Sequence, residues 1–159
     1  MKVLWAPWRG EYITSEKDGR CIFCRVSEEN NDEKNYVFAR KRDVFGMLNK
    51  FPYSSGHLMI APYRHVTDIG DLEEAEWVGM LELAKVSVKV LKDLMHPDGL
   101  NLGINSGDAS GAGFEHLHLH LVPRWKGDTN FMPVLAETKV ISEHLDAVYG
   151  KITDRLKSE

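Results

Sequence analysis

The stretch that decides the fold reads Glu115-His116-Leu117-His118-Leu119-His120-Leu121-Val122-Pro123-Arg124-Trp125. Successive side chains of a β-strand point to opposite faces, so this alternation predicts a strand over 116–122 with its leucines in the core. The three histidines would share the other face, where residues two apart lie about 6.6 Å from each other. Histidine is not a favoured strand residue. Three in alternation therefore indicate a functional site, in which imidazole can act as nucleophile, proton carrier or metal ligand.

The composition is typical of one globular domain. With 159 residues, the chain can bury a sizeable core but is too short for two ordinary domains. The net charge of -4 argues against a protein that coats nucleic acid. No apolar run approaches the ~20 residues of a membrane span, and the first residues lack the apolar centre of a signal peptide. We therefore expect a cytoplasmic protein with no nucleic-acid and no membrane partner.

The two cysteines, Cys21 and Cys24, form a CxxC pattern. In a reducing compartment, this spacing suits a metal better than a structural disulfide. It also fits a redox-active pair or two ordinary buried thiols. The spacing alone leaves these three alternatives open.

Hydrophobic patterning predicts an α+β domain with a mainly antiparallel sheet. The five strands are expected at 36–40, 44–49, 57–62, 100–105 and 116–122. Residues 1–20 are expected to form an N-terminal arm, and residues 126–159 a C-terminal extension that includes a helix, within a single domain 1–159.

One long helix is expected from Asp71 to Met95, with Asp71 and Glu74 as its N-terminal cap. Its core stripe is expected to contain Trp77, Met80, Leu81, Ala84, Val88, Leu91 and Met95. A terminal helix would bury Ile141, Leu145, Val148, Tyr149, Ile152 and Leu156. Residues 27–35 are polar and are interpreted as a solvated loop.

A loop rich in Gly and Ser, residues 106–113, comes directly before the histidine strand. Short residues let backbone N–H groups approach a ligand closely, which suits a phosphate. The alternative interpretation is a flexible turn.

The segment His116–Val122 resembles the signature of the histidine triad (HIT) superfamily of nucleotide hydrolases and transferases. The resemblance extends to Gly56-His57, Asn49, Asn105 and the Gly-rich loop, and it covers residues 21 to 125. Three further stretches resemble the branch that includes bacterial diadenosine tetraphosphate phosphorylases: Trp5-Ala6-Pro7-Trp8-Arg9, Pro123-Arg124-Trp125 and residues 127–134. The resemblance implies a HIT-like fold and a small-molecule nucleotide substrate.

The resemblance also implies a covalent mechanism. His118 would attack the α-phosphorus through Nε2 and form a nucleotidyl-histidine, which requires that its Nδ1 carry the proton. His120 would assist departure of the leaving group, and His57 would help line the phosphate site. The implied reaction is phosphorolysis or hydrolysis of a diadenosine polyphosphate such as diadenosine tetraphosphate.

The implied nucleotide and phosphate contacts come from Asn49, Asn105, Gly111, Ala112, Gly113 and Trp125. Asn49 matches a ribose-side position and Asn105 a position near the phosphates, while residues 111–113 would offer backbone donors to phosphate oxygens. Many relatives carry Gln and Ser or Thr where Ala112 and Gly113 stand. Side-chain contacts to the phosphate are therefore missing here.

Some family members bind zinc through a ligand set that corresponds to Cys21, Cys24, His65 and His116. Two thiolates and two imidazoles make a closed tetrahedral site, so the resemblance implies a structural zinc. Family members are usually homodimers, and the long helix and the tryptophan-rich arm offer surfaces for an interface. Two alternatives stay open: a hydrolase of nucleoside phosphoramidates, and a nucleotide-binding module with little turnover.

Overall fold

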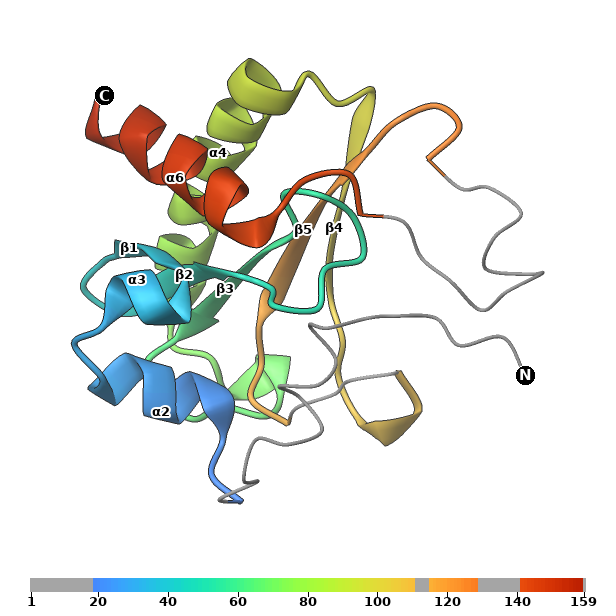
Figure 1. Cartoon of the computed structure of the whole chain (residues 1–159). Coiled ribbons are helices and arrows are strands. Elements are labelled where there is room, and N and C mark those ends of the chain that lie inside the picture. Colours follow the sequence, from blue (N-terminus) through green and yellow to red (C-terminus); the bar gives the residue numbers. More distant parts are fainter. Residues whose placement is uncertain (1–18, 111–114, 129–140, 159) are drawn as a thin grey trace, which may run out of the picture.

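The computed structural model describes residues 19–110, 115–128 and 141–158, which form an α+β fold around one five-stranded sheet (Figure 1). All strand pairs are antiparallel, and the order across the sheet is β1-β2-β3-β5-β4. The strands are β1 Val37–Arg40, β2 Val44–Leu48, β3 Leu58–Pro62, β4 Gly99–Ile104 and β5 Leu119–Arg124. The predicted fold class is confirmed, and all five predicted strands are present, although the last of them begins three residues later than predicted. The predicted N-terminal arm lies outside the described residues except for residues 19 and 20.

The histidine segment departs from the prediction at its start. Strand β5 begins at Leu119, so of the three alternating histidines only His120 lies within it. Before that point the backbone bonds elsewhere, because Leu117 N–H donates to the carbonyl of Val66 at 2.7 Å. The alternation survives nonetheless. The three leucines pack into one cluster of buried apolar residues, whereas Phe23, which belongs to a second such cluster, contacts the rings of His116 and His118.

The long helix is α4, Glu74–Met95. It begins at a capping box between Glu73 and Glu76, so the predicted cap at Asp71 is wrong; Ile69–Asp71 forms the short 3-10 helix η1 instead. The buried stripe consists of Met80, Leu83, Ala84, Ser87, Val90 and Leu91, together with Glu76. Trp77 and Leu81, predicted to be buried, lie on the flank of this stripe and are 36% and 48% exposed. Within the described residues, no helix is both long and apolar enough to cross a membrane.

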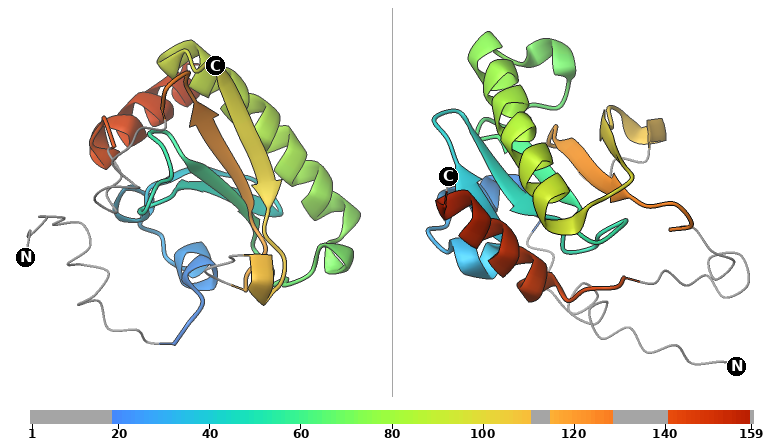
Figure 2. Two further views of the ribbon diagram at one scale, coloured as in Figure 1. Left: turned by 90° about the vertical axis from the view of Figure 1, so that its right-hand side faces the viewer. Right: turned by 90° about the horizontal axis from the view of Figure 1, so that it is seen from above.

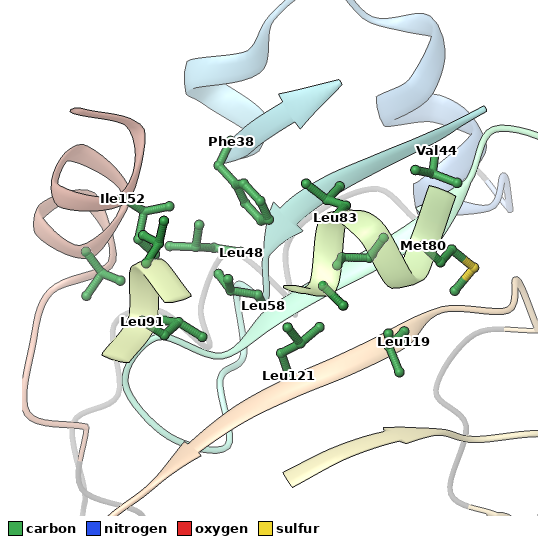
Figure 3. Close-up of a cluster of buried hydrophobic side chains, with 14 of the residues drawn as sticks. Phe38, Val44, Leu48, Leu58, Met80, Leu83, Leu91, Leu119, Leu121 and Ile152 are labelled. Atoms are coloured by element: carbon green, nitrogen blue, oxygen red, sulfur yellow. The ribbon is translucent and has the colours of Figure 1, made fainter. Parts of the chain in front are cut away.

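The main core lies between the sheet and the helices α4 and α6, Leu145–Lys157 (Figure 3). Leu48, Leu58 and Leu121 reach it from β2, β3 and β5. Helix α6 buries Val148 and Ile152, as predicted, whereas Ile141, predicted to lie on the same helical face, precedes the helix. Apolar packing dominates this side of the sheet and anchors the strands that carry the histidines.

Two short helices outside the main core contradict the loop predicted at 27–35: α2, Ile22–Glu28, and α3, Asp32–Asn35 (Figure 2). A second apolar cluster, separate from the main core, consists of Phe23, Val26, Val37, Phe45, Met47, Met59 and Ala61. The Arg40 guanidinium donates to the carbonyls of Val26, Ser27 and Glu29, which are the open acceptors at the end of α2. Helix α2 is therefore held at its C-terminus by a cation from strand β1.

Candidate functional site

The first histidine of the segment, His116, is 1% exposed and faces the two cysteines. Its Nε2 lies 3.0 Å from the carbonyl oxygen of Pro62, which can only accept, so Nε2 carries the proton. Nδ1 then bears a lone pair, and it lies 3.4 Å from Cys21 Sγ and 3.6 Å from Cys24 Sγ. Burial lowers the pKa of His116 to about 4, so the ring is neutral at neutral pH.

His65 completes a cluster of four possible metal ligands, with its Nδ1 at 3.3 Å from Cys24 Sγ. The four ligand atoms of Cys21, Cys24, His65 and His116 all lie within 4.8 Å of one another. In a tetrahedral site with Zn–S of about 2.3 Å and Zn–N of about 2.0 Å, neighbouring S and N ligands lie about 3.5 Å apart. The S–N distances in the cluster match that spacing. The predicted ligand set is therefore brought together in a geometry that can hold a metal ion.

The loop that carries His65 is tied to helix α4 by an ion pair. Arg64 makes two hydrogen bonds to the carboxylate of Glu76, at 3.0 and 2.7 Å, and a third to the carbonyl of Asp71. Glu76 is 5% exposed, and its hydrogen bonds from Arg64 lower the pKa of its carboxyl. This pair orders the segment that presents His65 to the cysteines.

The middle histidine, His118, carries its proton on the opposite ring nitrogen from His116. Its Nδ1 lies 2.7 Å from the carbonyl oxygen of His116 and donates to it. Burial lowers the pKa of His118, which favours the neutral ring. In that form Nε2 bears a lone pair, as a nucleophile requires. The ring of Phe23 packs against it, with ring centroids 4.6 Å apart.

The third histidine, His120, is linked to His57 by a hydrogen bond of 2.9 Å between His57 Nε2 and His120 Nδ1. The backbone N–H of Tyr53 donates to His57 Nδ1 at 3.1 Å, so His57 carries its proton on Nε2. His57 then donates to His120, whose own proton lies on Nε2. That Nε2 is buried and has no hydrogen-bond partner among the described residues.

The ring centroids of His118 and His120 are 4.5 Å apart, and the two rings are inclined by 67° in an edge-to-face arrangement. Burial, and then the neighbouring His118, lower the pKa of His120 to about 4, so both rings are neutral at pH 7. A lone pair on His118 Nε2 and an N–H on His120 Nε2 thus lie in adjacent rings. This pairing can attack an electrophilic centre and stabilise negative charge beside it.

The structure describes only some of the residues predicted to contact the nucleotide and its phosphates. Asn49 contacts His57, with Nδ2 at 3.4 Å from Nδ1. Asn105 directly follows Ile104, which pairs with Leu119, so it lies level with the start of β5 near His118. Gly111, Ala112 and Gly113 lie outside the described residues.

Trp125 lies at the other end of β5 from His118, about 23 Å along the strand. It lines a hollow of about 340 Å³ with Ser55, Met95, Ser142 and Glu143. A larger hollow of about 820 Å³ lies between α3, β1 and α6 and contains no histidine. Neither hollow coincides with the histidine cluster, and the chemistry of the cluster rather than cavity size identifies the site.

Two residues of the site were missed by sequence reasoning. Phe23 lies between the two cysteines in sequence and contacts both His116 and His118, with its ring centroid 5.1 and 4.6 Å from theirs. Tyr53 contributes a backbone donor, and its ring lies 4.7 Å from His57 and 5.9 Å from His120. The position of Phe23 inside the CxxC pattern was a usable signal, whereas a backbone N–H leaves no trace in residue type.

Known proteins and one protein-family profile show which family this chain resembles. A family profile described as HIT domain matches residues 30–127. A protein named AP-4-A phosphorylase from Mycobacterium tuberculosis is 36% identical over 154 residues, which cover 91% of this chain and 79% of that protein. A bis(5'-adenosyl)-triphosphatase from Dictyostelium discoideum is 31% identical over 92 residues, 58% of this chain and 62% of that protein.

The fold also matches solved structures. The crystal structure of a Zn-bound histidine triad family protein from Mycobacterium smegmatis superposes with a TM-score of 0.71 at 23% identity, over 88% of this chain and 95% of that chain. At this identity the similarity concerns the fold alone.

Proposed function

The chain belongs to the HIT domain family, and from that premise we propose that it is an enzyme that splits diadenosine polyphosphates at an α-phosphorus. The observation that carries the proposal is the 2.7 Å hydrogen bond from His118 Nδ1 to the carbonyl of His116, which frees Nε2 for attack. The names of two relatives, a phosphorylase of AP-4-A and a triphosphatase of bis(5'-adenosyl) substrates, support the substrate class.

In the proposed reaction, His118 Nε2 attacks the α-phosphorus and the bond to the bridging oxygen breaks. The adenylyl group is then held by His118, whose Nδ1–H remains bonded to the carbonyl of His116. His120 Nε2–H donates to the departing oxygen, where negative charge appears. His57 holds His120 in place through the 2.9 Å hydrogen bond.

The phosphate contacts remain part of the proposal. Gly111, Ala112 and Gly113 would offer backbone donors to the phosphate oxygens, because short side chains let backbone N–H groups approach a ligand closely. Asn105 would lie near the phosphates. Trp125 would border an anion only if a long substrate extended along β5, given its distance from His118.

Product analysis with diadenosine tetraphosphate tests the activity and identifies the second nucleophile. If inorganic phosphate attacks the adenylyl-histidine, the products are ADP and ATP. If water attacks, the products are AMP and ATP. The protein should release one of these pairs, and the comparison with and without phosphate decides which. Nucleotide binding with no product from any polyphosphate would show a binding module instead.

We also propose that the metal of the four-residue cluster is zinc and that its role is structural. Two thiolates and two imidazoles fill a tetrahedral shell and leave no open position for a substrate. Without a cation, burial and the adjacent Cys21 raise the pKa of Cys24 to about 11, and a bound Zn²⁺ would stabilise the thiolate form. Elemental analysis should find about one zinc per chain. A stable protein purified without metal would contradict this assignment.

A second copy of this chain is the proposed partner at the β4 edge. Leu102 on β4 is 51% exposed and pairs with the core residue Leu121, so both side chains lie on the α4 face of the sheet. On α4, Leu81 and Val78 are 48% and 44% exposed. Apolar side chains at an unpaired sheet edge favour association. Light scattering should find a dimer that Leu102→Asp dissociates, whereas Ile69→Asp, equally exposed on η1, should leave it intact.

We further propose a cytoplasmic location and a single domain. A cytoplasmic location is supported by the free pair Cys21 and Cys24, which suits a reducing compartment. A single domain 1–159 is supported by α6, since Val148 and Ile152 of the C-terminal extension pack into the main core.

A further inference from the structure

The hydrogen bonds behind His120 determine what its Nε2–H can do. His57 Nδ1 receives two donors: the backbone N–H of Tyr53 at 3.1 Å, and the side-chain amide of Asn49 at 3.4 Å. The orientation of that amide is fixed independently, because Asn49 Oδ1 accepts from Phe51 N–H at 2.9 Å. The nitrogen of the amide therefore faces His57. Both neighbours donate, so His57 Nδ1 can only accept.

An extra proton on the His57–His120 pair would create a contact between two donors. If His57 were protonated on Nδ1, that N–H would face the N–H of Tyr53 and the amide of Asn49. If His120 were protonated on Nδ1, that N–H would face His57 Nε2–H across 2.9 Å. Moving the His57 proton from Nε2 to Nδ1 would relieve the contact with His120. It would again place an Nδ1–H of His57 against the donors of Tyr53 and Asn49. Both rings are therefore held neutral.

A neutral His120 can donate a hydrogen bond but cannot give its proton away, since loss of Nε2–H would leave an imidazolate anion. A polyphosphate leaving group needs no proton: the P–O bond breaks, the electron pair stays on oxygen, and the group departs as an anion. An amine is different. When a P–N bond breaks, the electron pair stays on nitrogen, which must receive a proton to depart as a neutral amine.

Resting on the proposed nucleotidyl transfer, we infer that Tyr53 and Asn49 make this site selective for leaving groups that depart as oxyanions and against amine leaving groups. Asn49 and Tyr53 act as positioning residues, because they set the proton of His57 and, through it, the proton of His120. The proposal separates the two enzymatic alternatives that the sequence leaves open, diadenosine polyphosphates and nucleoside phosphoramidates.

The inference is tested with two substrates that share the adenylyl group. For the wild-type protein, kcat/KM should be at least about 100-fold higher for diadenosine tetraphosphate than for adenosine 5'-phosphoramidate, the range that a missing general acid costs. In Asn49→Asp, a carboxylate oxygen replaces the amide nitrogen. Its negative charge and its acceptor oxygen outweigh the facing Tyr53 N–H, so they favour a proton on His57 Nδ1. The pair can then hold a transferable proton, so the phosphoramidate should gain at least about tenfold relative to the tetraphosphate.

Asn49→Leu is the matched control, because it removes the amide donor without adding an acceptor while the Tyr53 N–H remains. Its ratio of the two kcat/KM values should stay close to that of the wild type. Equal wild-type rates for both substrates, or an unchanged ratio in Asn49→Asp, would overturn the inference. Circular dichroism verifies that each variant is folded.

Nitrogen-15 NMR of histidine-labelled protein gives a readout that does not depend on activity. The wild-type spectrum should show His57 unprotonated at Nδ1 and protonated at Nε2, and Asn49→Asp should show a proton on Nδ1. A wild-type Nδ1–H on His57 would refute the inference even if Asn49→Asp did not fold. Failure of the proposed function would look different: neither substrate would be cleaved, while the NMR pattern of His57 would be as expected.

Discussion

His116 and His118 are two residues apart and are both buried, at 1% and 4% exposure, yet their rings are prepared for different chemistry. His116 donates from Nε2 to Pro62 and turns a lone pair on Nδ1 toward two sulfur atoms. His118 donates from Nδ1 to the carbonyl of His116 and keeps its lone pair on Nε2. In both rings the lone pair is placed by the carbonyl that binds the opposite nitrogen. The acceptor, rather than the residue type, therefore assigns each role.

Loss of the nucleophile alone is expected to have the largest effect. His118→Ala should lower turnover of diadenosine tetraphosphate by at least about 10,000-fold, because no other group replaces the covalent step. Metal content should stay at the wild-type level, since His118 contributes no ligand to the cluster. Turnover and elemental analysis measure the two effects. Substantial remaining activity would show that His118 is not the nucleophile.

Removing one thiolate tests the role of the metal cluster that contains His116. Cys24→Ser should lower metal content and, through loss of a structural metal, reduce stability by about 3 kcal/mol, or about 10 °C in Tm. Turnover of the folded fraction should fall far less than in His118→Ala. Thermal unfolding with and without a chelator measures the effect. If the chelator changes neither protein, the cluster does not bind a stabilising metal.

The third effect, smaller than the two above, is a loss of stability at acidic pH that results from the buried, neutral ring of His120. Burial and the neighbouring His118 lower the pKa of His120 from 6.5 to about 4, so the unfolded chain binds a proton that the folded protein does not. The contribution of the neutral His120 to the free energy of unfolding is therefore intact above pH 6.5 and is lost as the pH falls from 6.5 toward 4. Urea unfolding at pH 7 and pH 5 should show this loss, and His120→Gln should show less of it. An equal loss in both proteins would contradict the assignment.

The smallest expected effect concerns Phe23, whose ring contacts both His116 and His118. Phe23→Leu keeps an apolar side chain but loosens both imidazoles, so stability should fall by about 1–2 kcal/mol. A positioning role predicts that kcat falls a few-fold while KM is unchanged, since Phe23 holds the nucleophile in place. Ile22→Ala, on the neighbouring and less buried position, should leave kcat unchanged. A change in KM alone would show a different role for the ring.

Much of the fold was predictable because its strands have clear hydrophobic patterns. The hairpin of β1 and β2 and the central strand β3 match their predicted ranges to within one residue at each end. Helix α2 was missed because it is seven residues long and buries only Phe23 and Val26, too few for a helical period. The start of α4 was misplaced because Asp71 and Glu74 have the same spacing as the capping pair Glu73 and Glu76.

The site was predictable in its residue types but not in its protons. Alternation indicated the function of the histidines, and the resemblance supplied the cluster of Cys21, Cys24, His65 and His116, which the structure brings together. Asn49 was expected beside a ribose, and its contact with His57 Nδ1 became visible only in the structure. Which nitrogen carries each proton depends on carbonyl and amide groups that every residue has, so no residue pattern reveals it.

The Tyr53 backbone N–H that sets the proton of His57 has an evolutionary consequence. A donor that belongs to the main chain is retained by almost every substitution at its position, and only proline removes it. Random replacement of Tyr53 can therefore change the ring above the site while the proton arrangement beneath it persists. By contrast, one base change converts an Asn codon to an Asp codon, so Asn49 is the position at which leaving-group preference could drift within a single mutation.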